Sequence, residues 1–370
     1  MSTLHCIEAI EAALSGTGWN KARVKLLARF LVALIGCRTV CLARLANALH
    51  GEAKVESHYK RLKRFVRPFD LSQAVLARLV LTLTQTAPPF VLAIDRTNWK
   101  LGKTEINILM LALVHPKWPI AFPLFWSVLG KAGNSALAER AALLQQFLVT
   151  FGKQSIDYLC ADREFGGEAF ARWLLREGVP FVLLRIRGNV TMTNAQGDKR
   201  TARGLFWHGK VGEARDLGQR RVFVGSGAGL WLHVAGMRVR GGDFAIVVSN
   251  IVSNRAVVGE DLLARYGRRW GIETLFGCLK RRGFDLEATH LTASDRLSRL
   301  LGVLALAYCW AYVAGEWLYA QRPWQVKKHG RLMVSLFRRG LDWLQRLFLP
   351  LCGNYSQQEA AFALHFLSRT

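Results

Sequence analysis

The chain has 370 residues, of which 51% are hydrophobic, and its 51 basic and 26 acidic residues give a formal net charge of +25. This hydrophobic content, with 12 Trp and 20 Phe, excludes a disordered chain and is enough for a full core with appended domains. The charge indicates a polyanionic partner, because net charge governs association rather than fold. Nucleic acid is the first candidate and an anionic membrane the second.

Cysteine use and hydropathy predict a cytoplasmic protein without a membrane span. The seven cysteines are odd in number and scattered, and they form no matched Cys-x-x-Cys pairs, so neither a disulfide framework nor a zinc site is expected. The N-terminus lacks the basic start of a signal peptide. The most apolar run, Leu300 to Gly315, is shorter than the roughly 20 residues of a membrane span and is predicted to be a core helix.

Residues 1–88 are predicted to form a helical DNA-binding region. Apolar residues recur at helical spacing from Val24 to Ile35 and from Leu42 to Leu49, before a break at Gly51. A basic helix follows near 57–66, carrying Lys60, Arg61, Lys63 and Arg64. This outline is typical of a DNA-reading helix pair, but it also fits a helical bundle with a basic outer face. Phosphate contact is favoured, because residues 1–90 hold 13 basic and 5 acidic residues.

Residues 89–187 change to the pattern of an α/β core. The pattern predicts strands over 90–95, 106–114, 120–129, 155–162 and 180–186, and helices over 135–151 and 167–178. The next segment, 188–252, is rich in Gly and alternates apolar with polar residues, which predicts a β-rich insertion. Residues 253–320 would complete the core with a helix around Glu273 and a long helix over 294–319, and 321–370 would form a basic helical C-terminal region.

Four polar residues near position 270 share one helical face. Tyr266, Arg269, Glu273 and Lys280 lie at offsets of 0, 3, 7 and 14, and at about 100° per residue these offsets return to nearly one angle. A carboxylate flanked by cations suits a surface that holds a metal ion and phosphates. A solvated charged helix face is the alternative.

Two further carboxylates favour a metal site. Asp95 and Asp162 each end a predicted apolar strand, so neighbouring strands would bring both to one sheet edge, and a helix across that edge would add Glu273. Three such carboxylates stay ionised only with cations between them, and oxygen ligands in an open site select Mg²⁺ or Mn²⁺. Two ions roughly 4 Å apart serve phosphodiester chemistry. The strand order predicts this geometry in a ribonuclease H-like core. Arg163 and Glu164 could orient Asp162 or DNA, or simply pair on the surface.

These motifs resemble those of the DDE transposases of bacterial insertion sequences, in the insertion-sequence-four-like subgroup marked by Tyr-x2-Arg-x3-Glu-x6-Lys. Tyr266, Arg269, Glu273 and Lys280 fit that spacing, and the resemblance runs from about residue 60 to 345. Ile94 to Trp99 is similar to the first catalytic motif and Ala161 to Phe165 to the second. Relatives that flip a base often carry Trp on the strand before the signature helix. Here Phe244 is the only aromatic residue in the corresponding strand.

The resemblance implies an endonuclease that performs cut-and-paste transposition with two Mg²⁺ or Mn²⁺ ions. Asp95 would bridge the ions and Asp162 and Glu273 would each complete one site, while Tyr266, Arg269 and Lys280 would grip phosphates. The implied partners are double-stranded DNA, at terminal inverted repeats and at the target, and a second copy of the chain in a synaptic dimer. A ribonuclease H-like structure-selective nuclease without strand transfer, or a non-catalytic DNA-binding protein, is the alternative.

Overall fold

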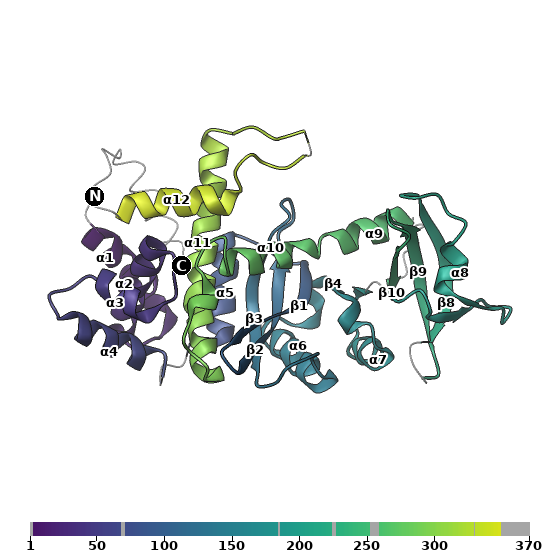
Figure 1. Ribbon diagram of the computed structural model, residues 1–370, viewed down its shortest axis with the longest axis horizontal. Coiled ribbons are helices and arrows are strands. Elements are labelled where there is room, and N and C mark those ends of the chain that lie inside the picture. The colour runs from purple at the N-terminus through teal and green to yellow at the C-terminus, as the bar shows by residue number, and fades with distance from the viewer. Residues whose placement is uncertain are drawn as a thin grey trace.

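Ten strands among the described residues form one continuous sheet. The computed structural model in Figure 1 describes residues 3–67, 71–183, 186–223, 227–251, 259–328 and 330–348. Along the sheet the strand order is β3-β2-β1-β4-β5-β10-β9-β8-β6-β7. Much of the predicted C-terminal region, 349–370, lies outside the described residues. The chain is therefore a mixed α/β protein built around a large sheet.

The elements follow one another along the chain in three groups. The first group is helical: α1 (Thr3–Ala13), α2 (Lys21–Cys37), α3 (Leu42–Ala48), α4 (Val55–Phe65) and α5 (Gln73–Thr84). The second is mixed: β1 (Phe90–Leu101), β2 (Thr104–Val114), β3 (Ala121–Leu129), α6 (Leu137–Phe151), β4 (Ile156–Ala161), α7 (Glu168–Glu177) and β5 (Phe181–Leu183). The third begins with β6 (Thr191–Thr193), β7 (Lys199–Thr201), α8 (Ala202–Phe206), β8 (Ala214–Phe223), β9 (Leu230–Arg238) and β10 (Phe244–Ser249), and ends with α9 (Gly259–Gly267), α10 (Trp270–Leu279), α11 (Ser294–Gln321) and α12 (Leu336–Phe348).

The half of the sheet around β1 has a mixed topology. β1, β2 and β3 are antiparallel neighbours, whereas β4 runs parallel to β1 and β5 parallel to β4. The strands and helices predicted over 89–187 are confirmed in order and type. One detail of that prediction is wrong, because β1 does not end at Asp95 but continues to Leu101 along β2. Residues 96–100 are mostly polar and so lack the apolar pattern of a buried strand, although Thr97 is buried in the structure.

The β-rich segment continues this sheet. β10 pairs antiparallel with β5, with Val248 opposite Leu183 and Ser249 opposite Val182, and Ile186 N donates to Ile246 O at 3.0 Å. Side chains extend this short ladder, since Ser249 Oγ donates to Phe181 O at 2.7 Å and Phe181 N donates to Asn250 Oδ1 at 2.7 Å. The predicted insertion thus shares a sheet with the preceding strands.

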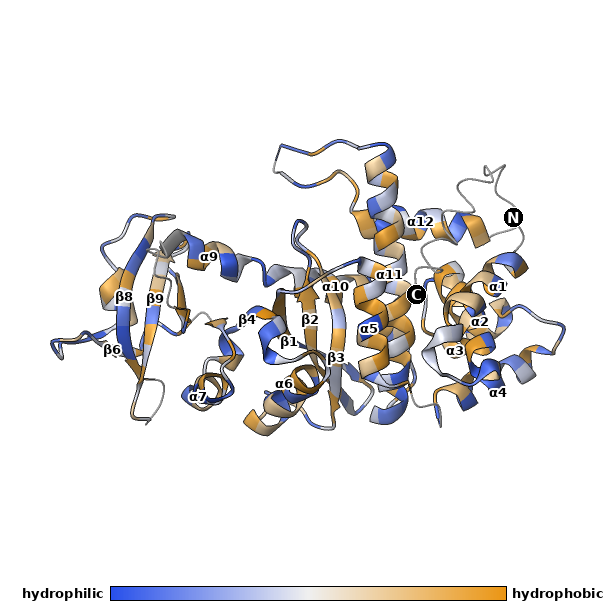
Figure 2. Ribbon diagram, turned by 180° about the vertical axis from the view of Figure 1, so that it is seen from behind, coloured by the Kyte–Doolittle hydropathy of each residue, from blue (hydrophilic) through white to orange (hydrophobic). Residues whose placement is uncertain are grey.

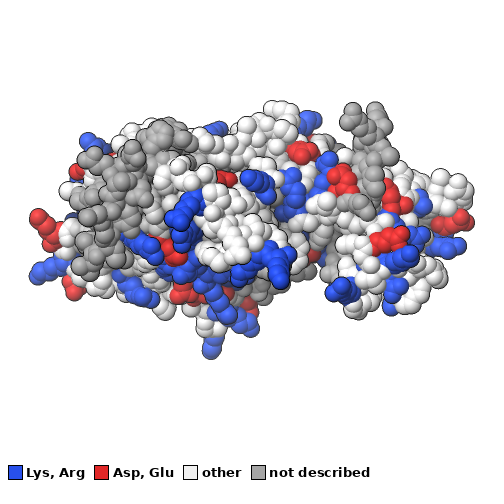
Figure 3. Space-filling model, turned by 90° about the horizontal axis from the view of Figure 1, so that it is seen from above, with Lys and Arg blue, Asp and Glu red and all other residues white. Residues whose placement is uncertain are grey.

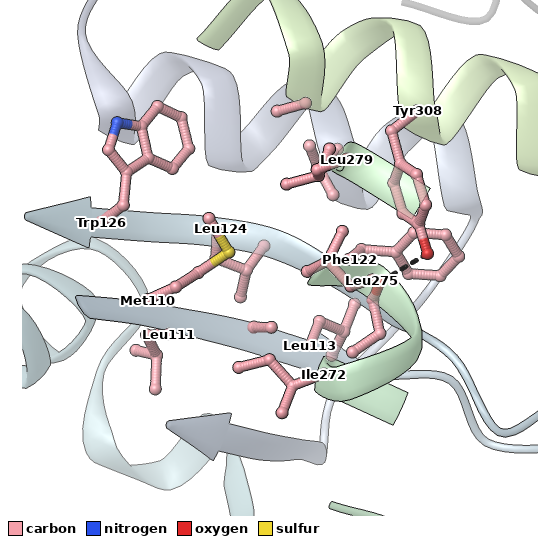
Figure 4. Packing of buried hydrophobic residues seen from close by; sticks show 14 of the residues in the cluster. Met110, Leu111, Leu113, Phe122, Leu124, Trp126, Ile272, Leu275, Leu279 and Tyr308 are labelled. Atoms are coloured by element: carbon pink, nitrogen blue, oxygen red, sulfur yellow. Dashed lines mark hydrogen bonds between the residues drawn. The ribbon is translucent and has the colours of Figure 1, made fainter. Parts of the chain in front are cut away.

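Helices cover both faces of the β1–β3 part of the sheet. Phe125 of β3 meets Phe147 of α6 on one face, at a ring distance of 6.3 Å. On the other face Tyr308 of α11 donates a hydrogen bond to Ala121 O at 3.0 Å. Figure 4 shows α10 on this second face, with Leu275 and Leu279 packed over β2 and β3. Burial of these apolar side chains stabilises the position of α10 at roughly 25 cal/mol per Å² of apolar area.

Two close approaches of backbone fix helices in place. A Cβ atom on Gly271 of α10 would lie 2.7 Å from Ile120 C and O, so only glycine lets the start of α10 reach the β3 backbone. Gly315 of α11 and Gly340 of α12 cross in the same way, with a Cβ on Gly340 falling on Ala311 O. Glycine at positions 271, 315 and 340 is therefore required for the start of α10 and for the crossing of α11 with α12.

α11 is the core helix of the helical layer. It is long and apolar enough to cross a membrane, but 89% of its most apolar window is buried inside the protein. Figure 2 shows hydrophobic residues concentrated in α2, α5 and α11, while α4 carries a hydrophilic side. The prediction that residues 300–315 belong to a core helix is confirmed by this burial.

Candidate active site

Asp95 and Asp162 lie side by side on neighbouring strands. β1 and β4 are parallel, and Ile94 pairs with Ala161, so each aspartate follows a paired residue. Each carboxylate accepts a hydrogen bond from the next backbone N–H, at 2.7 Å from Arg96 to Asp95 and 2.6 Å from Arg163 to Asp162. The predicted juxtaposition of the two aspartates is present, although Asp95 is mid-strand and Asp162 is at a strand end.

Arg269 joins Asp95 to Glu273. Its Nη1 donates to Asp95 Oδ2 at 2.9 Å, and its Nη2 donates to Glu273 Oε1 at 2.5 Å. The side chain of Arg269 is only 5% exposed and that of Asp95 is 14% exposed, whereas Glu273 is partly open to solvent. Asp95 and Glu273, which are far apart in sequence, thus share one buried guanidinium.

The cluster holds more negative charge than Arg269 neutralises. Burial raises the pKa of Asp95 to about 6, with the Asp162 and Glu273 carboxylates adding to the rise, although Arg269 and the Arg96 N–H act to lower it. Burial would lower the pKa of Arg269, but Tyr266, Asp95 and Glu273 around it outweigh burial and raise that pKa. The carboxylates therefore lie near enough to repel one another.

The donor set fits a hard divalent cation in its chemistry. Three carboxylates offer the oxygen ligands that Mg²⁺ and Mn²⁺ prefer, and their mutual repulsion favours a cation between them. Over the described ranges, no three His, Cys, Asp or Glu side chains are placed as a ready metal cage. The guanidinium of Arg269 lies between Asp95 and Glu273.

The signature residues occupy two helices and their ends, which corrects the prediction of one continuous helix. Tyr266 is on α9, Arg269 caps the start of α10, Glu273 is inside α10 and Lys280 follows its end. The turn at 268–269 separates the two helices. The four side chains therefore do not form a single helical stripe.

Tyr266 and Lys280 lie on either side of this cluster. The Arg269 guanidinium lies 5.7 Å from the Tyr266 ring centre, and burial raises the pKa of that phenol. Lys280 Nζ donates to Asn98 O at 3.1 Å and pairs with Glu287 at 3.0 Å. Lys280 thus lies against the far part of β1, beyond Asp95.

A second cluster, centred on Glu164, was only partly foreseen. Arg96 Nε donates to both Glu164 oxygens at 3.1 and 2.9 Å, and Ser135 donates through N and Oγ at 2.9 and 2.8 Å. Asn107 accepts from Arg96 Nη1 at 3.0 Å, and Arg140 lies 3.6 Å from Glu164. Arg96 follows Asp95 and Glu164 comes two residues after Asp162, so this pair ties the two aspartate-bearing segments together. The sequence signal was their adjacency to the two aspartates.

The basic residues predicted in the N-terminal region lie on one side of α4. Lys60, Arg61, Lys63 and Arg64 are exposed, while His58, Leu62 and Phe65 are buried. Figure 1 places α4 at the left end of the molecule and β4 near its middle, with α5 and the strands β1–β3 between them. These four cations therefore form a surface separate from the aspartates.

Comparison with known proteins assigns the family. Residues 87–310, more than half of the chain, match the family described as "Transposase DDE domain". No curated protein matches the chain. Among solved structures, the chain is similar to a piggyBac transposase in a synaptic complex with hairpin DNA, at a TM-score of 0.46 and 13% identity over 99% of this chain and 85% of that one. It is also similar to Endonuclease V from Bacillus subtilis, at a TM-score of 0.27 and 11% identity over 70% of this chain and 95% of that one. The family match spans both aspartates and Glu273, and the chain belongs to the DDE transposase family.

Proposed function

We propose that this transposase moves an insertion sequence by cut-and-paste, nicking DNA at terminal inverted repeats and joining the freed 3′-hydroxyl to target DNA. The observation that carries the proposal is the link from Asp95 to Glu273 through Arg269, with Asp162 following the neighbouring strand and close enough to raise the pKa of Asp95. The Tyr-Arg-Glu-Lys spacing supports membership of the insertion-sequence-four-like subgroup. The order β3-β2-β1-β4-β5, with β1 and β4 parallel at its centre, supports a ribonuclease H-like core.

Asp95, Asp162 and Glu273 would hold two divalent ions, with Asp95 between the other two. When bound, such ions activate the attacking oxygen and stabilise the departing one. The protein would act on DNA in the cytoplasm, as a dimer that pairs two ends.

The remaining site residues would position the DNA backbone. The planar guanidinium of Arg269 suits a bidentate contact to phosphate, and Lys280 suits a point-charge contact. Arg269 Nη1 and Nη2 are engaged with Asp95 and Glu273, so a bidentate phosphate contact would compete with these carboxylates for the same guanidinium. Tyr266, stacked on Arg269, would limit where that guanidinium can move.

The proposal is tested by removing one carboxylate at a time. Asp95→Ala, Asp162→Ala and Glu273→Ala should each lower Mg²⁺-dependent nicking of a duplex that flanks the chain's own gene by about 10³-fold or more, equivalent to about 4 kcal/mol. Binding of the same duplex should persist. Asp157→Ala is the matched control, because Asp157 lies on β4 with a half-exposed side chain paired only loosely with Arg265.

Each result has a separate meaning. Nicking retained in one variant removes that residue from the site, and nicking that needs no divalent ion contradicts the metal assignment. Precut ends then test strand transfer, because a nuclease of the same fold would cut but not join. A protein that binds DNA without cutting it under any divalent ion would be a non-catalytic binder.

A further inference from the structure

The segment between α11 and α12, described over 322–328 and 330–335, forms a hairpin-like loop, here called the basic arm. Val326 and Leu332 are bridged, Met333 N donates to Gln325 O at 2.9 Å, and Lys327 N donates to Arg331 O at 2.8 Å. Figure 1 shows the arm extending from the upper end of α11, above the level of α10. The arm is a narrow loop that projects from the body of the protein.

The arm and its flanks carry charge of one sign. Residues 317–341 contain six Lys and Arg residues and no Asp or Glu. Lys327 and Lys328 are exposed and form no ion pair within the described part of the chain. Figure 3, which looks down on this side, shows Lys and Arg gathered over the middle of the molecule, where the arm projects. A solvated surface usually mixes both signs, so this concentration indicates an anionic partner.

Aromatic packing holds the base of the arm. Trp324 Nε1 donates to Val334 O at 2.8 Å, and the Trp324 ring lies 4.9 Å from Tyr319. Tyr319 in turn packs edge-on against Trp118 at 5.5 Å. Together with the close crossing of α11 and α12, this packing orders the base before any partner binds. A preorganised surface loses less conformational entropy on binding.

The base of the arm is linked to the candidate active site through the turn between β2 and β3. Arg268, next to Arg269, donates from Nη2 to His115 O at 3.4 Å. Two residues after His115, Lys117 is exposed and lies over the Trp118 ring at 5.1 Å. Basic residues therefore lie along a series of contacting elements that runs from Arg268, beside the candidate active site, through Lys117 to the basic arm.

We propose that the basic arm binds the phosphate backbone of the duplex whose end lies at Asp95, Asp162 and Glu273; this inference rests on the proposed function. The contact would be made away from the cleaved bond. Exposed Lys side chains on a projecting loop can reach backbone phosphates without entering a groove. Val326 and Met333 are half-exposed. Two such side chains are too few for the broad apolar face that seats a segment in a membrane interface.

The test removes two charges from the arm and two from the other side of the sheet. Lys327→Ala with Lys328→Ala is compared with Lys153→Ala with Arg176→Ala, whose exposed cations lie beyond α6 and on α7. Affinity for the flanking duplex is measured between 50 and 200 mM salt as log Kd against log salt. In the arm variant the magnitude of the slope should fall by about 2, and binding at the lowest salt should be roughly tenfold weaker. The slope falls because a complex with fewer phosphate contacts releases fewer counterions when it forms. The control pair should keep the wild-type slope.

Equal slopes and affinities for the arm variant and its control would overturn the inference. Binding to anionic phospholipid vesicles is measured in parallel, and a loss confined to vesicles would overturn it in favour of a membrane partner. Divalent-dependent nicking by the wild-type protein separates the two proposals. If the wild type nicks DNA and the arm variant binds it normally, only the proposal about the arm is rejected. If the wild type neither binds nor nicks DNA, the proposed function is rejected as well. Circular dichroism of both double variants confirms that they are folded.

Discussion

Two arginine–carboxylate clusters lie beside the same pair of strands and differ in how fully the carboxylate is satisfied. Glu164 accepts hydrogen bonds from Arg96 and from both donors of Ser135, and although burial acts against it, these bonds lower its pKa below the usual value. Asp95 has Arg269 and one backbone N–H, and its pKa rises to about 6.

The contrast separates a structural role from a functional one. The Glu164 cluster is complete within the chain, so it stabilises the fold. The Asp95 cluster keeps unbalanced negative charge in a buried place, which costs stability and is typical of a site that a cation or substrate completes. Three experiments test this distinction.

Glu164→Ala should cause the largest loss of stability. Removing one partner of a buried pair leaves Arg96 Nε and the two Ser135 donors without an acceptor and the Arg96 charge without its carboxylate, at a cost of about 3–5 kcal/mol in the free energy of unfolding. The side chains of Arg96 and Glu164 are only 14% and 15% exposed. Urea denaturation measures the loss.

Glu177→Ala is the control, because its partner Arg176 is 71% exposed. This variant should change stability by no more than about 1 kcal/mol. Similar small losses in both variants would show that the Glu164 cluster is not the structural one.

Asp95→Asn should raise stability at pH 7 when divalent ions are removed with EDTA. The folded-state pKa of Asp95 is raised from 3.8 to about 6, so between those values the folded state binds more protons than the unfolded state. Stability from this group is therefore highest below about pH 4 and falls as pH rises to about 6. The neutral amide should recover up to about 3 kcal/mol at pH 7.

Urea unfolding at intervals from pH 4 to 7 measures this effect as the difference between wild type and variant. Glu164 has the opposite sign, because its lowered pKa contributes stability above about pH 4.5 that is lost in acid. An Asp95→Asn protein less stable than wild type at pH 7 would mean that the Asp95 charge is fully compensated by Arg269.

Lys280→Ala should have the smallest effect. Lys280 belongs to neither cluster and pairs with Glu287 near the surface, so its loss should cost no more than about 1 kcal/mol of stability. If it contacts a phosphate, the salt slope of DNA binding should fall by about 1. Titrations against Lys153→Ala, measured as log Kd against log salt, detect this change. An unchanged slope would assign Lys280 to Glu287 and Asn98 alone.

The sequence predicts elements better than contacts. The apolar runs at 106–114 and 155–162 mark β2 and β4 because each strand is buried, and Asp162 follows β4 as expected. The extension of β1 past Asp95 was missed because four of the five residues 96–100 are polar, and pairing with β2 overrides that polarity. The break at 268–269 was missed because both flanking segments have helical periodicity.

The partners of the site residues lay beyond sequence reasoning. Arg269 and Asp95 are 174 positions apart. No local pattern indicates that Arg269, predicted to contact phosphate, will bind the Asp95 carboxylate. The Arg96–Glu164 pair spans 68 positions and depends on the register of β1 against β4. Charge type and spacing could identify the candidate carboxylates, but only the fold shows which cation each one meets.

The connection between β5 and β10 has a mechanical consequence. The β-rich part of the sheet is coupled to the aspartate-bearing strands through backbone pairs, through the side chains of Ser249 and Asn250, and through α9, which contacts both parts. Asn250 accepts a hydrogen bond from Phe181 N and donates one to Val179 O, so its side chain ties the end of β10 to the start of β5. DNA that pulls on β6–β9 would therefore load the aspartate-bearing strands through α9 as well as β10, because α9 contacts β8 and β9 on one side and β4 and β5 on the other. An altered Asn250 would weaken one of these two routes and leave the other.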